Sequence, residues 1–303
     1  AHAKAQTIIR DTEIENYIQE WMAPVFAAAG ISPDQVNIVI VQDDKINAFV
    51  AGGSNIFLYT GLLMKTQSAG EVVGVTSHEL GHIMGGHLIR GREAMEQASY
   101  ESILGMILGV GAAIATGDGG AAGAISTAGS SMAQRRFMSY SRAFESSADQ
   151  AAMTYMDKAQ INPSGLESFM RKLEGEELLS SDRQSEYVQT HPLTRNRIES
   201  IDARIAKSPY KDKPYPAVWD EQHKIMIAKL VGFIRPGQVA WTYDDRDNSI
   251  PSLTARAIGA YRTNDVQRAL KLADQLLAAA PNAYNLELKG QMLMDFGRVK
   301  DAI

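Results

Sequence analysis

The segment His78-Glu79-Leu80-Gly81-His82 limits what this chain can be more than any other part of it. It lies in a stretch, residues 69–90, that we expect to be helical. Two histidines one turn apart project from the same helical face, so both imidazoles can reach one metal ion. Glu79 can then reach a water molecule on that metal and act as a general base. The spacing is typical of zinc proteases, but it fixes only three positions and also occurs by chance, so the surrounding sequence has to decide.

The residues around this motif favour a buried helix. Residues 72–76 are apolar, small or β-branched, and glycines recur at Gly74, Gly81, Gly85 and Gly86. A glycine lowers helix stability by about 1 kcal/mol relative to alanine, so several of them indicate close packing against another element or room for a substrate. The alternative is an ordinary core helix with two solvated histidines. An imidazole without a partner would be unfavourable in so uncharged a stretch.

A zinc protease site needs a third protein ligand and an open fourth position. The HExxHxxGxxH pattern is disfavoured because position 88 is Leu88, and His87 comes one residue too early. The other common source is a glutamate on a later helix. Glu145 and Asp149 are four residues apart in a segment with small and apolar neighbours, and we expect helix over about 136–158. Glu145 can bind zinc while Asp149 accepts the spare ring N–H of a ligand histidine, although such a pair is more often a solvated helix face.

A further histidine, His191, precedes Pro192 and a predicted helix over 194–206. Proline biases the residue before it toward extended backbone, so we expect His191 in a loop. An isolated loop histidine usually lies on the surface. With a metal site nearby, His191 becomes a candidate transition-state stabiliser or reversible fourth ligand. Arg197 is a candidate for orienting a carboxylate or a substrate carbonyl.

Together, the HExxH motif, the pair Glu145 and Asp149, the His191-Pro-Leu-Thr sequence and the strand-like residues 47–53 resemble the HtpX/BepA type of zinc metallopeptidase. The resemblance covers about residues 36–206. It implies that His78, His82 and Glu145 bind one Zn²⁺ and that Glu79 is the base. His191 matches the family's active-site histidine, which in BepA-like members can cap the zinc when no substrate is present.

The chain most resembles the BepA-like branch, because the transmembrane helices of other members are not evident. That branch acts in the periplasm of Gram-negative bacteria, on outer-membrane protein assembly and quality control. The resemblance therefore implies a periplasmic location, possible association with the outer membrane, and protein or peptide substrates. The chain begins at Ala1 without Met and shows no signal peptide, so we expect it to have been processed or trimmed.

We expect a helix-rich α+β catalytic domain with one small sheet. Short strands are predicted at 36–41, 47–50 and 56–59, with helices at 11–29, 61–65 and 164–173. In peptidases of this plan an edge strand pairs with the substrate backbone, which makes specificity loose. Our candidates for substrate binding at that edge are Asn47, Ala48, Phe49, Gly52 and Gly53.

Residues 102–134 contain a single charge, Asp118, among Gly, Ala, Ile, Leu and Ser. The apolar run at 103–115 is too short to span a bilayer. One interpretation is a buried helical hairpin. The other is a flap near the site that contacts unfolded protein or the membrane surface.

Composition excludes some functions and leaves others open. The net charge of −5 comes without a basic block, so nucleic acid is not an expected partner. The chain has no Cys, which fits an oxidising compartment without establishing one.

We expect three parts: a zinc metallopeptidase domain at 1–208, a proline-rich linker and packing segment at 209–251, and tetratricopeptide-like helical repeats at 252–303. The small and turn residues of the last part follow a period of about 34, with Asn264 in the place of one turn glycine. The repeats would bind protein partners. They end inside an expected helix at Ile303, so we expect the array to be truncated; an unrelated helical tail is the alternative.

The sequence therefore predicts a zinc-dependent endopeptidase. The rival is a non-enzymatic chaperone or scaffold whose repeats bind clients and whose zinc site is structural or capped. Glu79 argues against the rival, because a binding module has no need of that base. Substrate identity, cleavage preference and oligomeric state are not encoded in any pattern that we recognise.

Overall fold

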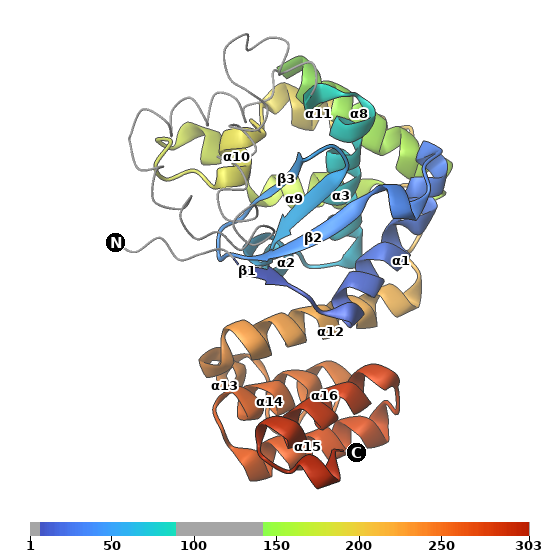
Figure 1. The fold of residues 1–303 in the computed structure, drawn as a ribbon. Helices are drawn as coiled ribbons and strands as arrows, with labels where there is room; N and C mark the ends of the chain where they lie inside the picture. Colours follow the sequence, from blue (N-terminus) through green and yellow to red (C-terminus); the bar gives the residue numbers. More distant parts are fainter. Residues whose placement is uncertain (1–6, 89–141, 303) are drawn as a thin grey trace. The chain divides into compact units, whose positions relative to one another are not determined.

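A computed structural model describes residues 7–88 and 142–302 of the protein (Figure 1). The chain divides into two compact units, Ala1–Tyr215 and Pro216–Ile303, which are described separately. The predicted hairpin or flap at 102–134, with its possible membrane-surface contact, lies outside the described residues. Within the described part of the chain, no helix is long and apolar enough to cross a membrane.

The first unit combines a small sheet with helices. Its elements are β1 (Thr7–Ile9), α1 (Thr12–Ala29), the 3-10 turn η1 (Pro33–Gln35), β2 (Asn37–Gln42), β3 (Ala48–Ala51), β4 (Asn55–Tyr59), α2 (Thr60–Lys65), α3 (Ala69–Met84), α8 (Arg142–Lys158), α9 (Ser164–Lys172), η3 (Glu176–Leu178), α10 (Glu186–Thr190) and α11 (Arg195–Ala206). This confirms the helix-rich α+β prediction for the catalytic region. The predicted strands, and the helices predicted at 11–29, 61–65, 164–173 and 194–206, are present within one or two residues. The helix predicted over about 136–158 is described from Arg142, and the short elements β1 and α10 were not predicted.

The sheet has the order β1-β2-β4-β3, so β3 is an edge strand within the described residues. The central pair, β2 and β4, is parallel, whereas β1 and β3 run antiparallel to their neighbours. Alternate side chains of β3 point to opposite faces. One face carries stacked Phe49 and Phe57 with their ring centroids 4.9 Å apart, and the helix α3 packs against β3 and β4.

Glycines allow α3 to lie unusually close to its neighbours α8 and α9. A Cβ atom added at Gly81 would lie 2.7 Å from the carbonyl oxygen of Ala148 in α8. A Cβ at Gly74 would lie 2.4 Å from the backbone nitrogen of Leu166 in α9. Both distances are shorter than real Cβ contacts, so only glycine fits without a shift. The close packing predicted from the glycine content is confirmed.

The two ends of α3 are well defined. At its start the Ser68 hydroxyl accepts a hydrogen bond from the Glu71 backbone N–H, as an N-cap does. The buried Glu71 carboxylate in turn accepts a hydrogen bond from the Ser168 hydroxyl in α9 at 2.6 Å. The predicted unbroken continuation of this helix is wrong, because α3 ends at Met84 and Gly85 and Gly86 form a turn before His87 and Leu88, which are again helical. Residues 89 and 90 lie outside the described residues.

The second unit is helical: α12 (Ala217–Ile234), η4 (Pro236–Gln238), α13 (Val239–Thr242), α14 (Ile250–Arg262), α15 (Val266–Ala279), α16 (Ala283–Asp295) and η5 (Val299–Asp301). Successive helices α14, α15 and α16 pack on one another through a core that includes Leu253, Leu272 and Met292. Asn264 takes a positive φ of 60°, as expected for a residue in the place of a turn glycine. The segment 209–251 contains α12, η4 and α13.

Candidate metal centre

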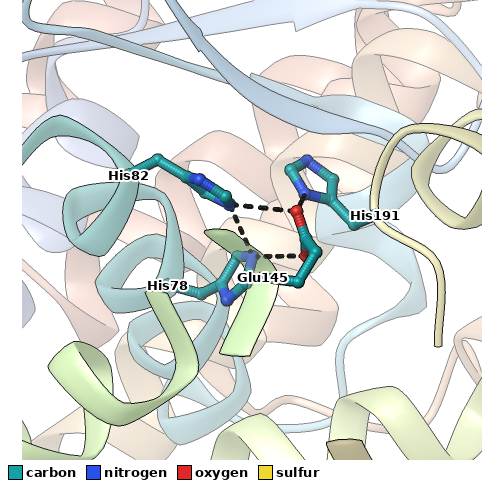
Figure 2. A group of neighbouring side chains, drawn as sticks. All are labelled: His78, His82, Glu145 and His191. Carbon is teal, nitrogen blue, oxygen red and sulfur yellow. Dashed lines mark hydrogen bonds and ion pairs between the residues drawn. The ribbon is translucent and has the colours of Figure 1, made fainter. Parts of the chain in front are cut away.

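The helix α3 supplies two imidazoles that face each other from successive turns (Figure 2). The Nε2 atoms of His78 and His82 are 3.0 Å apart, and both side chains are fully buried. Spacing of four residues places them on one helical face. If both Nε2 atoms carry lone pairs, neither can donate a hydrogen bond to the other. The pair is therefore suited to bind one cation between them.

The helix α8 brings a carboxylate to the same point. One oxygen of Glu145, Oε2, is 3.3 Å from His78 Nε2, and the other, Oε1, is 3.4 Å from His82 Nε2. The Oε1 atom is also 3.1 Å from Nδ1 of His191, which follows α10. The four side chains are buried, and one possible ligand atom from each lies within 4.8 Å of every other.

Behind this group, Asp149 supports His78. Its Oδ1 atom is 2.8 Å from His78 Nδ1, the ring nitrogen that faces away from the other ligands. Arg197 donates to both Asp149 oxygens, from Nε at 2.8 Å and from Nη2 at 2.9 Å. Its Nη1 lies 2.9 Å from Glu145 Oε2 and donates to the Pro192 carbonyl at 2.7 Å. One guanidinium therefore connects two carboxylates of α8, Glu145 and Asp149, to the loop after His191.

His191 contacts the sheet as well as the carboxylate. Its backbone N–H donates to the Tyr187 carbonyl at 2.7 Å, and its Nε2 is 3.2 Å from the Ala48 carbonyl oxygen in β3. The same Nε2 lies 3.5 Å from Oε1 of Glu79. The ring therefore stands between the edge strand, the metal-binding group and the expected base.

Burial and charge set the protonation of the group. Burial alone would lower the pKa of His78, but hydrogen bonds to Asp149 and Glu145 raise that pKa to about 10. Burial lowers the pKa of His82 to about 3. Burial also opposes ionisation of Glu145, yet the surrounding histidines hold the pKa of that carboxyl well below its usual range. Burial raises the pKa of Glu79. The site thus holds an ionised Glu145 carboxylate and a neutral His82 imidazole, the forms that bind metals, while His78 carries a proton that a bound metal ion would have to displace.

These residues fit a zinc ion. Ligand atoms about 2.0–2.1 Å from one tetrahedral zinc lie roughly 3.3 Å from each other. The shortest separations between nitrogen and oxygen atoms of the group, 3.0, 3.1, 3.3 and 3.4 Å, are near that value, and one ligand atom from each of the four residues lies within 4.8 Å of every other. Imidazole nitrogens and a carboxylate oxygen are also the donors that zinc takes in catalytic sites. Zinc is therefore the cofactor that this centre holds, one ion per chain.

Glu79 lies beside this group without a hydrogen-bond partner, although its Oε1 is 3.5 Å from His191 Nε2. Its side chain is fully buried, and neither carboxylate oxygen makes a hydrogen bond to any described residue. Leaving a buried carboxylate in this state is unfavourable by roughly 1–3 kcal/mol or more, because its hydration is lost. A buried carboxylate that stays without hydrogen bonds beside a metal-binding group is better explained by a catalytic role than by packing.

The predicted substrate-binding residues do not all lie together. Ala48 is at the centre, through its carbonyl contact with His191. Asn47 donates from Nδ2 to Glu186 at 3.2 Å, and Phe49 packs on the aromatic face of the sheet. Gly52 and Gly53 form the turn between β3 and β4, with positive φ values of 59° and 88°.

Two further side chains of the centre had no assigned role in the sequence analysis. Tyr187 is fully buried, its ring centroid is 4.7 Å from that of His191, and its hydroxyl has no hydrogen bond to a described residue. His87 was rejected as a ligand, yet its Nδ1 lies 2.9 Å from Nδ1 of His82. Neither residue belongs to a known metal-binding motif. The one available signal was the four-residue interval from Tyr187 to His191, which in a helix would place both side chains on one face.

Comparison with known proteins shows which family the chain resembles. Residues 10–205 match the model of Peptidase family M48. The beta-barrel assembly-enhancing proteases of Yersinia pestis and Escherichia coli K12 are each 24% identical, over 97% and 98% of this chain and 61% of each relative. The metalloprotease LoiP of Escherichia coli K12 is 27% identical over 58% of this chain and 65% of its own length.

The chain spans about three fifths of the length of the two assembly-enhancing proteases. The family match covers well over half of the chain and includes α3, α8, α10 and α11, the elements that carry or adjoin the metal centre. The family resemblance carried by the four motifs is confirmed, and this chain belongs to Peptidase family M48.

Proposed function

We propose that the protein is a zinc-dependent endopeptidase in which Glu79 is the general base. The observation that carries the proposal is the Glu79 carboxylate, which is fully buried beside the four metal-binding side chains and makes no hydrogen bond to a described residue. A structural zinc site has no use for such a group. A carboxylate that makes no hydrogen bond and lies beside the metal-binding group is what removal of a proton from water requires.

The chain's residues divide the chemistry between them. A zinc ion held by His78, His82 and Glu145 supplies a Lewis acid that lowers the pKa of a water molecule toward about 7 and polarises a peptide carbonyl. Glu79 accepts the proton of the attacking water at a carboxylate oxygen and returns it to the leaving amine. Burial raises the pKa of Glu79, which makes its carboxylate the stronger base.

His191 has two roles in this proposal. Its Nδ1 is 3.1 Å from Glu145 Oε1, so in the resting protein it would be the fourth ligand of a bound zinc ion and would exclude water from that position. Once substrate displaces it, the same imidazole is close enough to stabilise the developing oxyanion. The buried Tyr187 hydroxyl, beside His191, is a second donor for that charge.

Substrate would bind along β3. This strand is the sheet edge among the described residues, and the Ala48 carbonyl is within 3.2 Å of His191 Nε2. A peptide added to this edge would pass directly by Glu79 and the metal ligands. Because strand addition is made through backbone groups, it suits unfolded or misassembled proteins of varied sequence.

The wider setting follows from the relatives. Two of them are named beta-barrel assembly-enhancing proteases, so we propose a part in outer-membrane protein assembly and quality control, in the periplasm of a Gram-negative bacterium. The domains are a peptidase domain at 1–208, a packing segment at 209–251, and tetratricopeptide-like repeats from 252 that bind protein partners. The packed helices α14 and α15, with Asn264 at their turn, support the repeat assignment.

The test compares Glu79→Gln with Glu174→Gln, the same chemical change at an exposed position. Each purified, zinc-loaded protein is incubated with an unfolded protein, and zinc content and cleavage are both measured. Glu79→Gln should keep its zinc and its fold while cleavage falls by about 10² or more. Glu174→Gln should cleave normally. Unchanged cleavage by Glu79→Gln would contradict the mechanism, and no cleavage by zinc-loaded wild type would favour the chaperone or scaffold.

A further inference from the structure

His87 is a buried histidine beside the metal centre with no part in the chemistry described above. Its side chain is 1% exposed, and its Nδ1 is 2.9 Å from Nδ1 of His82. The other ring nitrogen of His82, Nε2, faces His78 and Glu145. His87 therefore approaches His82 from the side opposite the other ligands, the side that Asp149 occupies for His78.

The chain places His87 there by local geometry. The helix α3 ends at Met84, and Gly86, with φ of 62°, turns the backbone so that His87 folds back toward the helix. Its ring lies so close to Gly85 that a Cβ atom there would be 2.3 Å from His87 Nε2. On its other side the ring stacks on Phe144, with centroids 4.6 Å apart and planes 12° from parallel. The imidazole is thus held in one orientation.

The contact between the two Nδ1 atoms determines which one carries the proton. Two ring nitrogens 2.9 Å apart need a single hydrogen between them. If His82 Nε2 binds a metal, that nitrogen has no proton, so neutral His82 carries its proton on Nδ1. His87 must then accept with Nδ1 and carry its own proton on Nε2.

We propose that His87 is a positioning residue: it accepts the Nδ1–H of His82 and fixes the tautomer and ring orientation in which His82 Nε2 holds the metal. The two histidines of the HExxH motif are then supported differently, His78 by the charged Asp149 and His82 by a neutral imidazole. Groups that support a metal-binding histidine in this way typically contribute 10–100-fold to metal affinity. The inference rests on the proposed peptidase site, because it uses the same metal centre.

Substitutions at position 87 test the proposal in the full chain, with zinc affinity measured by competition against a chelator. His87→Leu keeps an apolar side chain against Phe144 but removes the acceptor, and should weaken zinc binding about 10–100-fold. His87→Asn places an oxygen near the position of Nδ1 and should recover most of that loss. His87→Gln extends its oxygen toward the position of Nε2 and should not. Affinity unchanged in His87→Leu, or equally weak in His87→Leu and His87→Asn, would overturn the inference.

A second measurement needs no variant and so does not depend on folding of the substituted chains. Long-range ¹H–¹⁵N spectra of the zinc-loaded wild type report which ring nitrogen of each histidine is protonated. His87 should be protonated on Nε2 and His82 on Nδ1; a proton on His87 Nδ1 would overturn the inference. A wild-type chain that takes up no zinc would overturn the peptidase site and this inference together, whereas zinc binding indifferent to position 87 would overturn the inference alone.

Discussion

The contact between Gly81 and Ala148 predicts that Gly81→Ala damages metal binding more than folding. The added Cβ would lie 2.7 Å from the Ala148 oxygen, about 0.7 Å inside the 3.4 Å at which ordinary contact begins. To relieve this, α3 and α8 must separate, and α8 carries Glu145. Ligand distances at a metal site tolerate only about ±0.2 Å. A helix shift of several tenths of an ångström should therefore move Glu145 out of range.

The matched control is Gly74→Ala, because it makes a similar clash on the same helix. Its Cβ would meet the Leu166 backbone of α9 at 2.4 Å, and α9 supplies no metal ligand. Overpacking costs about 1–3 kcal/mol, offset by about 1 kcal/mol from the better helix propensity of alanine. Both variants should therefore lose up to about 2 kcal/mol of unfolding free energy.

Only Gly81→Ala should also lose metal affinity, by about tenfold or more, which corresponds to at least about 1.4 kcal/mol. Urea titration of the metal-free proteins gives the stability, and chelator competition gives the zinc dissociation constant. Equal zinc affinities in the two glycine variants would refute the argument that the close approach of α3 to α8 sets the ligand geometry.

Three further predictions concern the charges around the centre. Arg197→Met should lower the unfolding free energy by about 3–5 kcal/mol in urea titrations, because it leaves two buried carboxylates uncompensated, and adding Asp149→Asn should restore part of it. The pKa of His78 is raised from 6.5 to about 10 in the metal-free fold, so its stabilising contribution is complete below pH 6.5 and is lost as pH rises toward 10. Thermal unfolding of the metal-free protein across that range should show the decline, and zinc, which competes with this proton, should bind more tightly at higher pH. His191→Ala should raise basal cleavage if the imidazole caps the metal; a fall in kcat of about 10²–10³ would instead identify it as an oxyanion donor.

The sequence predicts local geometry better than it predicts the meeting of distant segments. His78 and His82 are four residues apart, and residues at that spacing lie on the same face of any α-helix. The two histidines reach Glu145 because α3 approaches α8 closely at Gly81. The glycine content of α3 predicts a close approach to another element, but it does not show which helix that element is. Here the four-residue spacing of Glu145 and Asp149 made Glu145 a candidate ligand, and the family resemblance implied the same residue.

The early end of α3 shows what the pattern does not encode. The glycines before His87 are compatible with a helix of modest stability, and the prediction carried the helix through them to residue 90. In the structure Gly86 adopts a positive φ, which no periodicity of apolar residues signals. A histidine that looks misplaced by one residue for metal binding thereby reaches the rear of His82.

The backbone on both sides of His191 is fixed, and this has a consequence for the kinetics of a cap. Its own N–H is bonded to the Tyr187 carbonyl, and the carbonyl of the next residue, Pro192, accepts from Arg197. Release of the ring from the metal would therefore proceed by side-chain rotation, without rearrangement of the chain. Loop and domain motions take on the order of microseconds to milliseconds. Because the buried His191 ring would move without its backbone, we expect its release to be faster than such motions. Such a cap would re-equilibrate many times within one catalytic cycle, so it would compete with substrate as a rapid intramolecular inhibitor. Progress curves should then begin at full rate, with no lag after substrate is added.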